Sequence, residues 1–361
     1  LPVKGLWELR EAIANYHRRK GDVDRSAEDV LIGPGSKELM FLLQLVFYGD
    51  LVIPAPSWVS YDTQARIIGR PVHYINTDRE NEWCLNAETF RNHCEQDPDR
   101  PAILILNYPN NPTGHTYQPA ELEAIANVAR DHGVVLLSDE IYGELHHKGE
   151  HDSIARFYPE GTIISGGLSK WCGAGGWRLG TFTFPSSLRW LLEAMAVVAS
   201  ETFTATSAPI QFAAVRAFQG GLRIENYLSH SRRILRTLAE RLSADLRQAG
   251  LSLVRPDGAF YLMVDFEPYR QKLAERDITT SEQLCARLIE DTGVAILPGS
   301  VFGRPRSELT ARLAYVDFDG AEALTASAEI ASDQKLTEHY LERHCPRVLR
   351  GVERMCEWAA G

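Results

Sequence analysis

The chain of 361 residues is poor in cysteine and has no long apolar run. Its six cysteines are widely spaced and form no CxxC pair: Cys84, Cys94, Cys172, Cys285, Cys345 and Cys356. A disulfide framework or a thiolate zinc site is therefore not expected, and a reducing cytoplasmic compartment fits best. Since no apolar segment approaches the roughly 20 residues of a membrane helix, we expect no membrane span.

Clustered positive charge is also missing. The chain has 38 Lys and Arg residues against 48 Asp and Glu residues, a formal net charge of -10, and no basic stripe. Because nucleic acid backbones are bound by clustered cations, we expect no nucleic-acid partner. A small phosphate held in one local pocket stays possible.

The remaining composition is that of a globular protein, with 44% hydrophobic and 24% charged residues. At roughly 150 residues per domain, the length suggests two domains. Apolar runs without strict alternation, separated by helical patterns, predict a mostly parallel α/β sheet covered on both faces over residues 26–185. These strands are expected at residues 30–32, 51–53, 72–75, 102–106, 134–137, 162–164 and 181–184.

The pattern changes after Gly220-Gly221. A long amphipathic helix is followed by strand-like stretches at residues 251–254, 259–264, 294–297 and 312–316, and helix then dominates to the end. This pattern predicts a second, smaller α+β domain. We therefore divide the chain into an N-terminal segment (1–25) that packs with the small domain, a large domain (26–220) and a small C-terminal domain (221–361).

The segment Gly166–Gly180 is the richest in chemistry. Lys170 sits in a glycine-dense loop after a buried strand, and Arg178 follows eight residues later. A single lysine is usually a solvated charge, but small and apolar neighbours favour a desolvated amine, which suits Schiff-base chemistry. The glycines allow close backbone approach to a ligand, and an arginine can grip a phosphate with two hydrogen bonds.

Two further motifs follow expected strands. Asn107-Tyr-Pro-Asn-Asn111-Pro-Thr-Gly is rich in turn residues and taken alone could be a plain turn. Ser138-Asp139-Glu-Ile-Tyr142 places an aspartate at the carboxyl end of a strand, where ligands bind in open α/β sheets. The alternative for Asp139 is a helix cap.

Taken together and in this order, these three motifs resemble the pyridoxal-phosphate-dependent aminotransferases of class I/II, which are fold type I enzymes like aspartate aminotransferase. Pro256–Tyr261 and Leu297–Gly303 also resemble family segments, and the likeness extends to about residue 325. The resemblance implies a large α/β domain that binds pyridoxal 5'-phosphate and a smaller α+β domain.

The resemblance also implies residue roles. Lys170 would form a Schiff base with the cofactor and move the proton of the reaction. Asp139 would keep the pyridine nitrogen protonated, while Asn111 and Tyr142 would donate to the ring hydroxyl. Arg178 would hold the phosphate.

Further positions match the family less specifically. Gly35-Ser36-Lys37 opens a helix whose free N–H groups suit phosphate, although a plain capped helix is the alternative. Trp58 matches the aromatic residue that stacks on the cofactor ring, or is a core tryptophan. Arg312 matches the arginine that pairs with the substrate α-carboxylate, or is a surface strand residue, and the resemblance places Asn111 at the substrate as well. Lys37 matches a lysine that some bacterial aspartate aminotransferases place near a distal carboxylate.

The sequence departs from the family in three places that matter, one of which is a C-terminal tail (residues 333–361) that is longer and more charged than the family leads us to expect. Position 167, often a phosphate-binding serine, is Gly167, so Ser169 is expected to contribute instead. The family tyrosine that reaches the partner subunit's phosphate would fall just before Leu1, and we expect that the natural N-terminus lies upstream.

We therefore predict a transaminase that moves an amino group from an L-amino acid to a 2-oxo acid, as a homodimer with active sites at the subunit interface. A lyase, cyclase or β/γ-eliminating enzyme on the same scaffold is the first alternative, and an aminotransferase-like regulator domain is the second. No metal site is expected. The cluster His146, His147 and His151 is interpreted as a solvated loop.

Overall fold

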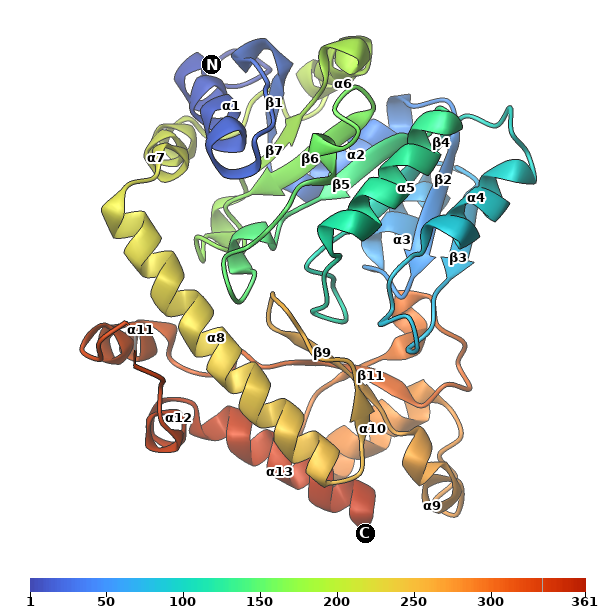
Figure 1. Ribbon diagram of the computed structural model, residues 1–361, viewed down its shortest axis with the longest axis vertical. Helices are drawn as coiled ribbons and strands as arrows, with labels where there is room; N and C mark the ends of the chain where they lie inside the picture. The colour runs from blue at the N-terminus through green and yellow to red at the C-terminus, as the bar shows by residue number, and fades with distance from the viewer. Residues whose placement is uncertain (333) are drawn as a thin grey trace.

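The computed structural model describes residues 1–332 and 334–361 and has two lobes joined by the long helix α8 (Leu222–Gln248) (Figure 1). The upper lobe holds a seven-stranded sheet in the order β1-β7-β6-β5-β4-β2-β3. Its strands are β1 (Val30–Gly33), β2 (Asp50–Ala55), β3 (Val72–Asn76), β4 (Ala102–Asn107), β5 (Val135–Asp139), β6 (Thr162–Gly167) and β7 (Gly180–Thr183). Strands β2 to β6 run parallel and β7 runs antiparallel to both neighbours, so the predicted mostly parallel sheet is confirmed.

Helices cover both faces of this sheet. Alternate residues of β4 point to opposite sides: Ile103 and Ile105 pack in one buried cluster, Leu104 and Leu106 in another. The first cluster is closed by α2 (Ser36–Val46), α3 (Ser60–Ile67) and α6 (Arg189–Glu201), and the second by α4 (Ala87–Glu95) and α5 (Pro119–Asp131). Burial on both faces explains why the strands read as continuous apolar runs.

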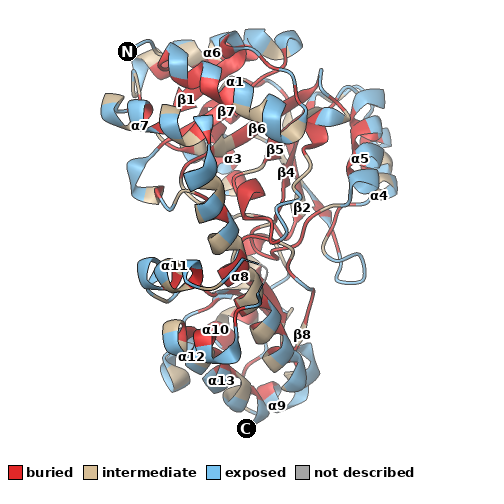
Figure 2. Cartoon of the chain, turned by 60° about the vertical axis from the view of Figure 1, so that its left-hand side comes forward, coloured by how far each residue is buried: buried red, intermediate tan, exposed pale blue. Residues whose placement is uncertain are grey.

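The lower lobe is built on a four-stranded antiparallel sheet in the order β10-β11-β9-β8. The strands are β8 (Ser252–Leu253), β9 (Tyr261–Asp265), β10 (Leu297–Pro298) and β11 (Thr310–Ala314). Around it lie α9 (Arg270–Ala274), α10 (Ser281–Thr292), α11 (Gly320–Ala328), α12 (Glu338–His344) and α13 (Pro346–Ala360). Figure 2 shows buried residues running through the waist between the two lobes.

The N-terminal helix lies elsewhere than expected. Helix α1 (Trp7–Gly21) packs against α7 (Ala208–Gln219) and β1 in the upper lobe, far from the small sheet (Figure 1). Tyr16 meets Phe218 edge-on, with ring centroids 5.5 Å apart, and the Arg10 side chain donates to the carbonyl of Val30. At its end, Lys20 pairs with Glu225 in the first turns of α8, the helix that joins the lobes. The expected packing of residues 1–25 on the small domain therefore differs from the structure, while the boundary at residue 220 stays a prediction.

Among the described residues, no helix is both long enough and apolar enough to cross a membrane.

Candidate active site

A cavity of about 460 Å³ lies at the carboxyl ends of the parallel strands, where the upper lobe faces β9 and β11. It is lined by ten of the eleven residues predicted from the sequence: Ser36, Lys37, Trp58, Asn111, Asp139, Tyr142, Ser169, Lys170, Arg178 and Arg312. The eleventh, Gly35, adjoins Ser36 and lies against the guanidinium of Arg178. The structure thus brings all the predicted positions to one place.

Three neighbouring strand ends form the floor of the cavity. The register pairs Asn107 on β4 with Asp139 on β5, and Asp139 with Ser165 on β6. The Asn107 amide donates to the carbonyl of Asp139 over 2.9 Å, and its oxygen accepts from the backbone N–H of Asn111 over 2.8 Å. Asn107 thereby fixes the turn that carries Asn111.

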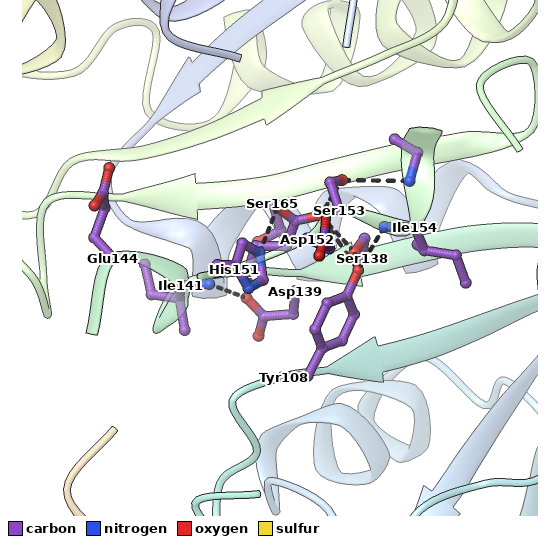
Figure 3. A network of polar contacts seen from close by, with 12 residues as sticks. Tyr108, Ser138, Asp139, Ile141, Glu144, His151, Asp152, Ser153, Ile154 and Ser165 are labelled. Carbon is purple, nitrogen blue, oxygen red and sulfur yellow. Dashed lines mark hydrogen bonds and ion pairs between the residues drawn. The ribbon is translucent and has the colours of Figure 1, made fainter. Parts of the chain in front are cut away.

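The Asp139 carboxylate is buried and surrounded by donors. It accepts hydrogen bonds from the Tyr61 hydroxyl over 2.5 Å, from Ser165 over 3.3 Å and from the backbone N–H of Ile141 over 3.4 Å. Figure 3 shows the last two contacts. Burial raises the pKa of Asp139 to about 6, although these donors act in the opposite direction. A cationic ring N–H is a partner that suits such a carboxylate.

A second polar network surrounds Glu140, the residue that follows β5. Its carboxylate accepts from Ser138 over 2.8 Å and from Ser153 over 2.5 Å, and pairs with His151 over 3.0 Å. The Tyr108 hydroxyl joins Ser138 to the backbone of Ile154 (Figure 3).

The interpretation of the histidine cluster as a solvated loop is wrong. His146 and His147 are 7% and 6% exposed, because the loop is held against the segment Asp257–Ala259. The backbone N–H of His147 donates to the carbonyl of Asp257 over 2.7 Å, and that of Ala259 donates to Leu145 over 3.1 Å. The polar residues of this stretch had favoured a solvated loop in the prediction from sequence.

Lys170 extends into the cavity from the loop after β6. Its Nζ lies 5.5 Å from the ring centroid of Tyr142 and 5.9 Å from that of Phe260. Burial lowers the pKa of Lys170, and the charges of Arg312, Arg178 and Lys37 act in the same direction, while Asp139 opposes them. A lysine amine with a lowered pKa is a better nucleophile at neutral pH.

An anion cradle lies beside the lysine, at the first turn of α2. Gly35 has a φ of +97°, and a Cβ there would come within 2.0 Å of the Arg178 Nη2. Arg178 has a left-handed backbone, with a φ of 54°, and its guanidinium donates to the carbonyl of Gly175 over 2.7 Å. Free N–H groups at the helix start and an exposed guanidinium converge here, as a phosphate requires.

The departure at position 167 has a steric reason. Gly167 has a φ of +152°, and a Cβ there would lie 2.6 Å from the carbonyl oxygen of Leu179. Strands β6 and β7 approach too closely for a serine side chain. Ser169 lines the cavity, as its expected contribution requires.

The opposite wall of the cavity is aromatic and cationic. The Arg312 guanidinium carbon lies 4.6 Å from the ring centroid of Tyr261 and 5.1 Å from that of Phe302. Its Nη1 donates to Asn111 Oδ1 over 2.9 Å, whereas its buried Nε has no hydrogen-bond partner among the described residues. Arg312 is thus a half-buried cation and not a solvated strand residue.

Two more contacts complete the lining. The hydroxyls of Tyr142 and Tyr261 are hydrogen-bonded over 2.9 Å, across the boundary between the lobes. The Lys37 Nζ lies 4.9 Å from the ring centroid of Trp58. No role was predicted from the sequence for Tyr61, Tyr261 or Asn107. The signal for Tyr61 was its position three residues after Trp58, and the two rings meet edge-on with centroids 5.4 Å apart.

The residues fit pyridoxal phosphate: a desolvated lysine, a buried carboxylate that has no ion pair among the described residues, and an anion cradle that a Cβ at Gly35 would fill. Together with the α/β sheet, they define a pyridoxal-phosphate-dependent enzyme of fold type I. Residues 1–317 match the family described as aminotransferase class I and II. The chain belongs to this family and is a transaminase, which moves an amino group from an amino acid to a 2-oxo acid.

Similar proteins carry related names. An aspartate aminotransferase of a Bacillus species is 32% identical over 322 residues, covering 87% of this chain and 78% of the relative. An aspartate/prephenate aminotransferase of Thermus thermophilus is 33% identical, with 83% and 75% covered. The solved structure of an aspartate aminotransferase from Thermus thermophilus with maleate has a TM-score of 0.79 at 32% identity, covering 91% of this chain and 81% of that one.

An aromatic aminotransferase from Pyrococcus horikoshii has a similar fold. Its TM-score is 0.81 at 26% identity, with 99% of this chain and 87% of that chain covered. Fold similarity therefore extends across relatives with different named substrates, and the side chains of the cavity must discriminate between them.

Proposed function

We propose that the enzyme transaminates a dicarboxylic amino acid, L-aspartate or a close analogue, with a 2-oxo acid as acceptor. The observation that carries this proposal is the presence of two separate cations, Lys37 and Arg312, in the lining of one cavity. Arg312 would take the α-carboxylate and Lys37 the distal one. The names of the Bacillus and Thermus relatives are consistent with this choice.

Pyridoxal phosphate, when bound, supplies a reactive aldehyde carbon and an electron-accepting ring. Lys170 would hold that carbon through its Nζ. The Lys170 amine would also be the group that moves the proton at the substrate Cα. Asp139 would hold the ring nitrogen in its protonated form, supported by the hydrogen bond from Tyr61.

The other lining residues would bind and orient. Arg178, Ser36 and Ser169 would hold the phosphate, with Gly35 leaving the space for it. Trp58 would cover the ring, while Asn111 and Tyr142 would donate to the ring hydroxyl. Asn111 also accepts a hydrogen bond from Arg312, so one amide would connect cofactor binding with binding of the α-carboxylate.

The substrate choice is tested by comparing L-aspartate with L-alanine in the wild type and in Lys37→Met. Loss of one charge-assisted hydrogen bond costs about 1.5–3 kcal/mol, so kcat/KM for aspartate should fall at least tenfold. The value for alanine, which has no distal carboxylate, should change less than twofold. Equal effects on both substrates, or a wild type that prefers alanine, would refute the dicarboxylic assignment.

We further propose a homodimer, formed through the upper lobe. Large apolar side chains are exposed there, including Tyr48 (70%), Phe212 (59%) and Leu222 (77%). Tyr48 and Trp190 lie with ring centroids 6.4 Å apart, so part of this apolar surface is contiguous. Sedimentation should give twice the chain mass, and Phe212→Glu should lower it, whereas a fully active monomer would contradict the proposal.

A further inference from the structure

A second cavity, of about 610 Å³, lies between the lobes and apart from the one that contains Lys170. The upper lobe contributes the segment 116–119 and the loop that starts at His146. The lower lobe contributes one face of α8 and the residues 255–257. We call this cavity the interlobe cleft.

Most carboxylates of the cleft have a basic partner. Four acidic residues line it, and three of them have ion-pair partners: Asp257 with His115, Asp152 with Arg156, and Glu240 with Arg255. The fourth, Glu150, is exposed and has no ion pair among the described residues.

The cations of the cleft are less fully paired. Lys148, Arg236 and Arg247 line it, and none has a carboxylate within ion-pair distance among the residues that the structure describes. Arg247 has a long hydrogen bond of 3.4 Å to the carbonyl of Leu253. Three cations therefore face one free carboxylate, in a chain whose net charge is -10. Such a local excess attracts anions.

The placement of these cations favours a ligand with more than one charge. Arg236 and Arg247 are eleven residues apart, which is close to three helical turns, so they lie on the same face of α8. Lys148 belongs to the other lobe. An anion that reaches both sides would bridge the lobes, with guanidinium groups suited to forked contacts with phosphate or carboxylate.

The His146 ring, which lines the cleft, adds a neutral donor to this arrangement. Burial lowers the pKa of His146 and of His147 to about 4, so both rings are neutral at pH 7. The Nδ1 of His146 accepts from the backbone N–H of Glu150 over 3.0 Å, which leaves the proton on Nε2.

The loops of the cleft also line the active site. Backbone hydrogen bonds connect His147 to Asp257 over 2.7 Å and Asp257 to Gly114 over 2.8 Å. The same three segments carry Tyr142, Tyr261 and Asn111 into the first cavity. A ligand in the cleft would therefore contact segments that also position residues of the active site.

We propose that the interlobe cleft is a binding site for a small polyanion that carries two or more phosphate or carboxylate groups, with Arg236, Arg247 and Lys148 as its charged partners. This site is separate from the binding of cofactor and amino acid. It does not depend on the substrate choice proposed above.

The test is calorimetric titration of the purified holoenzyme with two probes, inorganic pyrophosphate and citrate, at low ionic strength. We expect at least one probe to bind, and which of them binds more tightly distinguishes phosphate from carboxylate ligands. Arg236→Gln and Arg247→Gln should each weaken the affinity at least tenfold. The matched control is Arg223→Gln, which removes an exposed arginine at the start of the same helix and should leave the affinity unchanged.

Cofactor absorbance of each variant verifies that it has folded and is loaded. Failure of both probes to bind the wild type at about 5 mM would overturn the proposal. Binding that all three variants retain would overturn it too, because the probe would then be held elsewhere, for example by Arg312.

Discussion

The Tyr61 hydroxyl donates to Asp139 Oδ2 over 2.5 Å, in a place where both side chains are buried. Tyr61 comes from the start of α3 and Asp139 from the end of β5, so the bond joins two elements that meet only in the fold. A buried carboxylate without this donor would be more easily protonated, and a protonated Asp139 could not stabilise a cationic ring nitrogen.

Tyr61→Phe removes the donor and leaves the ring. A hydrogen bond to a charged group contributes about 1.5–3 kcal/mol, so we expect the cofactor to bind at least tenfold more weakly. The pKa of Asp139 should rise, because the bond lowers it, and the acid limb of the kcat/KM profile should move to higher pH. Tyr158→Phe, another buried tyrosine, is the control. An unshifted acid limb would show that Tyr61 has no influence on Asp139.

Asp139→Asn should change the pH dependence of the cofactor-free protein's stability. The folded-state pKa of about 6 lies above the ordinary value, so the folded carboxyl holds a proton that the unfolded one releases between about pH 4 and 6. Its contribution to the free energy of unfolding is therefore present at low pH and is lost as pH rises through that window, by on the order of 3 kcal/mol. The variant lacks this loss. Its free energy of unfolding, measured in urea, should therefore rise relative to that of the wild type between pH 4 and 7. If the free energies of unfolding of the two proteins depend on pH in the same way, the pKa of Asp139 is not raised.

Gly35→Ala should damage the anion cradle. The new Cβ would meet the Arg178 guanidinium, and the φ of +97° is strained for alanine by about 1–3 kcal/mol. We expect a cofactor dissociation constant at least tenfold higher. Gly69→Ala is the control, because Gly69 also has a positive φ, of +70°, but its Cβ would meet no atom within 4 Å. If both variants lose cofactor affinity equally, backbone strain and not the cradle is responsible.

Arg312→Lys should raise KM for every α-amino acid at least tenfold while the cofactor absorbance stays intact. Lysine keeps the charge but loses the fork of donors and the flat surface that lies against Tyr261. Steady-state kinetics with aspartate and alanine measure the effect, which should be similar for both. An effect confined to aspartate would mean that Arg312 binds the distal carboxylate instead.

Much of the fold could be predicted from local patterns. The run at residues 102–106 became β4 because a central parallel strand is buried on both faces and has to be apolar throughout. The strand expected at residues 294–297 is instead the two-residue β10, which begins at Leu297. An apolar run predicts burial, but only a neighbouring strand in register makes it a strand.

The residues that line the candidate site could be predicted because its motifs are local and chemically distinctive. Tyr61 and Tyr261 were missed because their contacts depend on tertiary placement: each hydroxyl acts on a residue 78 or 119 positions away. The histidine loop was misinterpreted for the same reason, since the segment that buries His147 comes about 110 residues later.

The central claim is that Lys170 is the residue that holds the cofactor. Borohydride reduction of the holoenzyme, followed by proteolysis and mass spectrometry, tests it most directly. We expect one pyridoxyl adduct, on the peptide that contains Lys170, and no adduct in Lys170→Ala. An adduct on Lys37 or another lysine, or none in a protein that retains the cofactor absorbance, would contradict it.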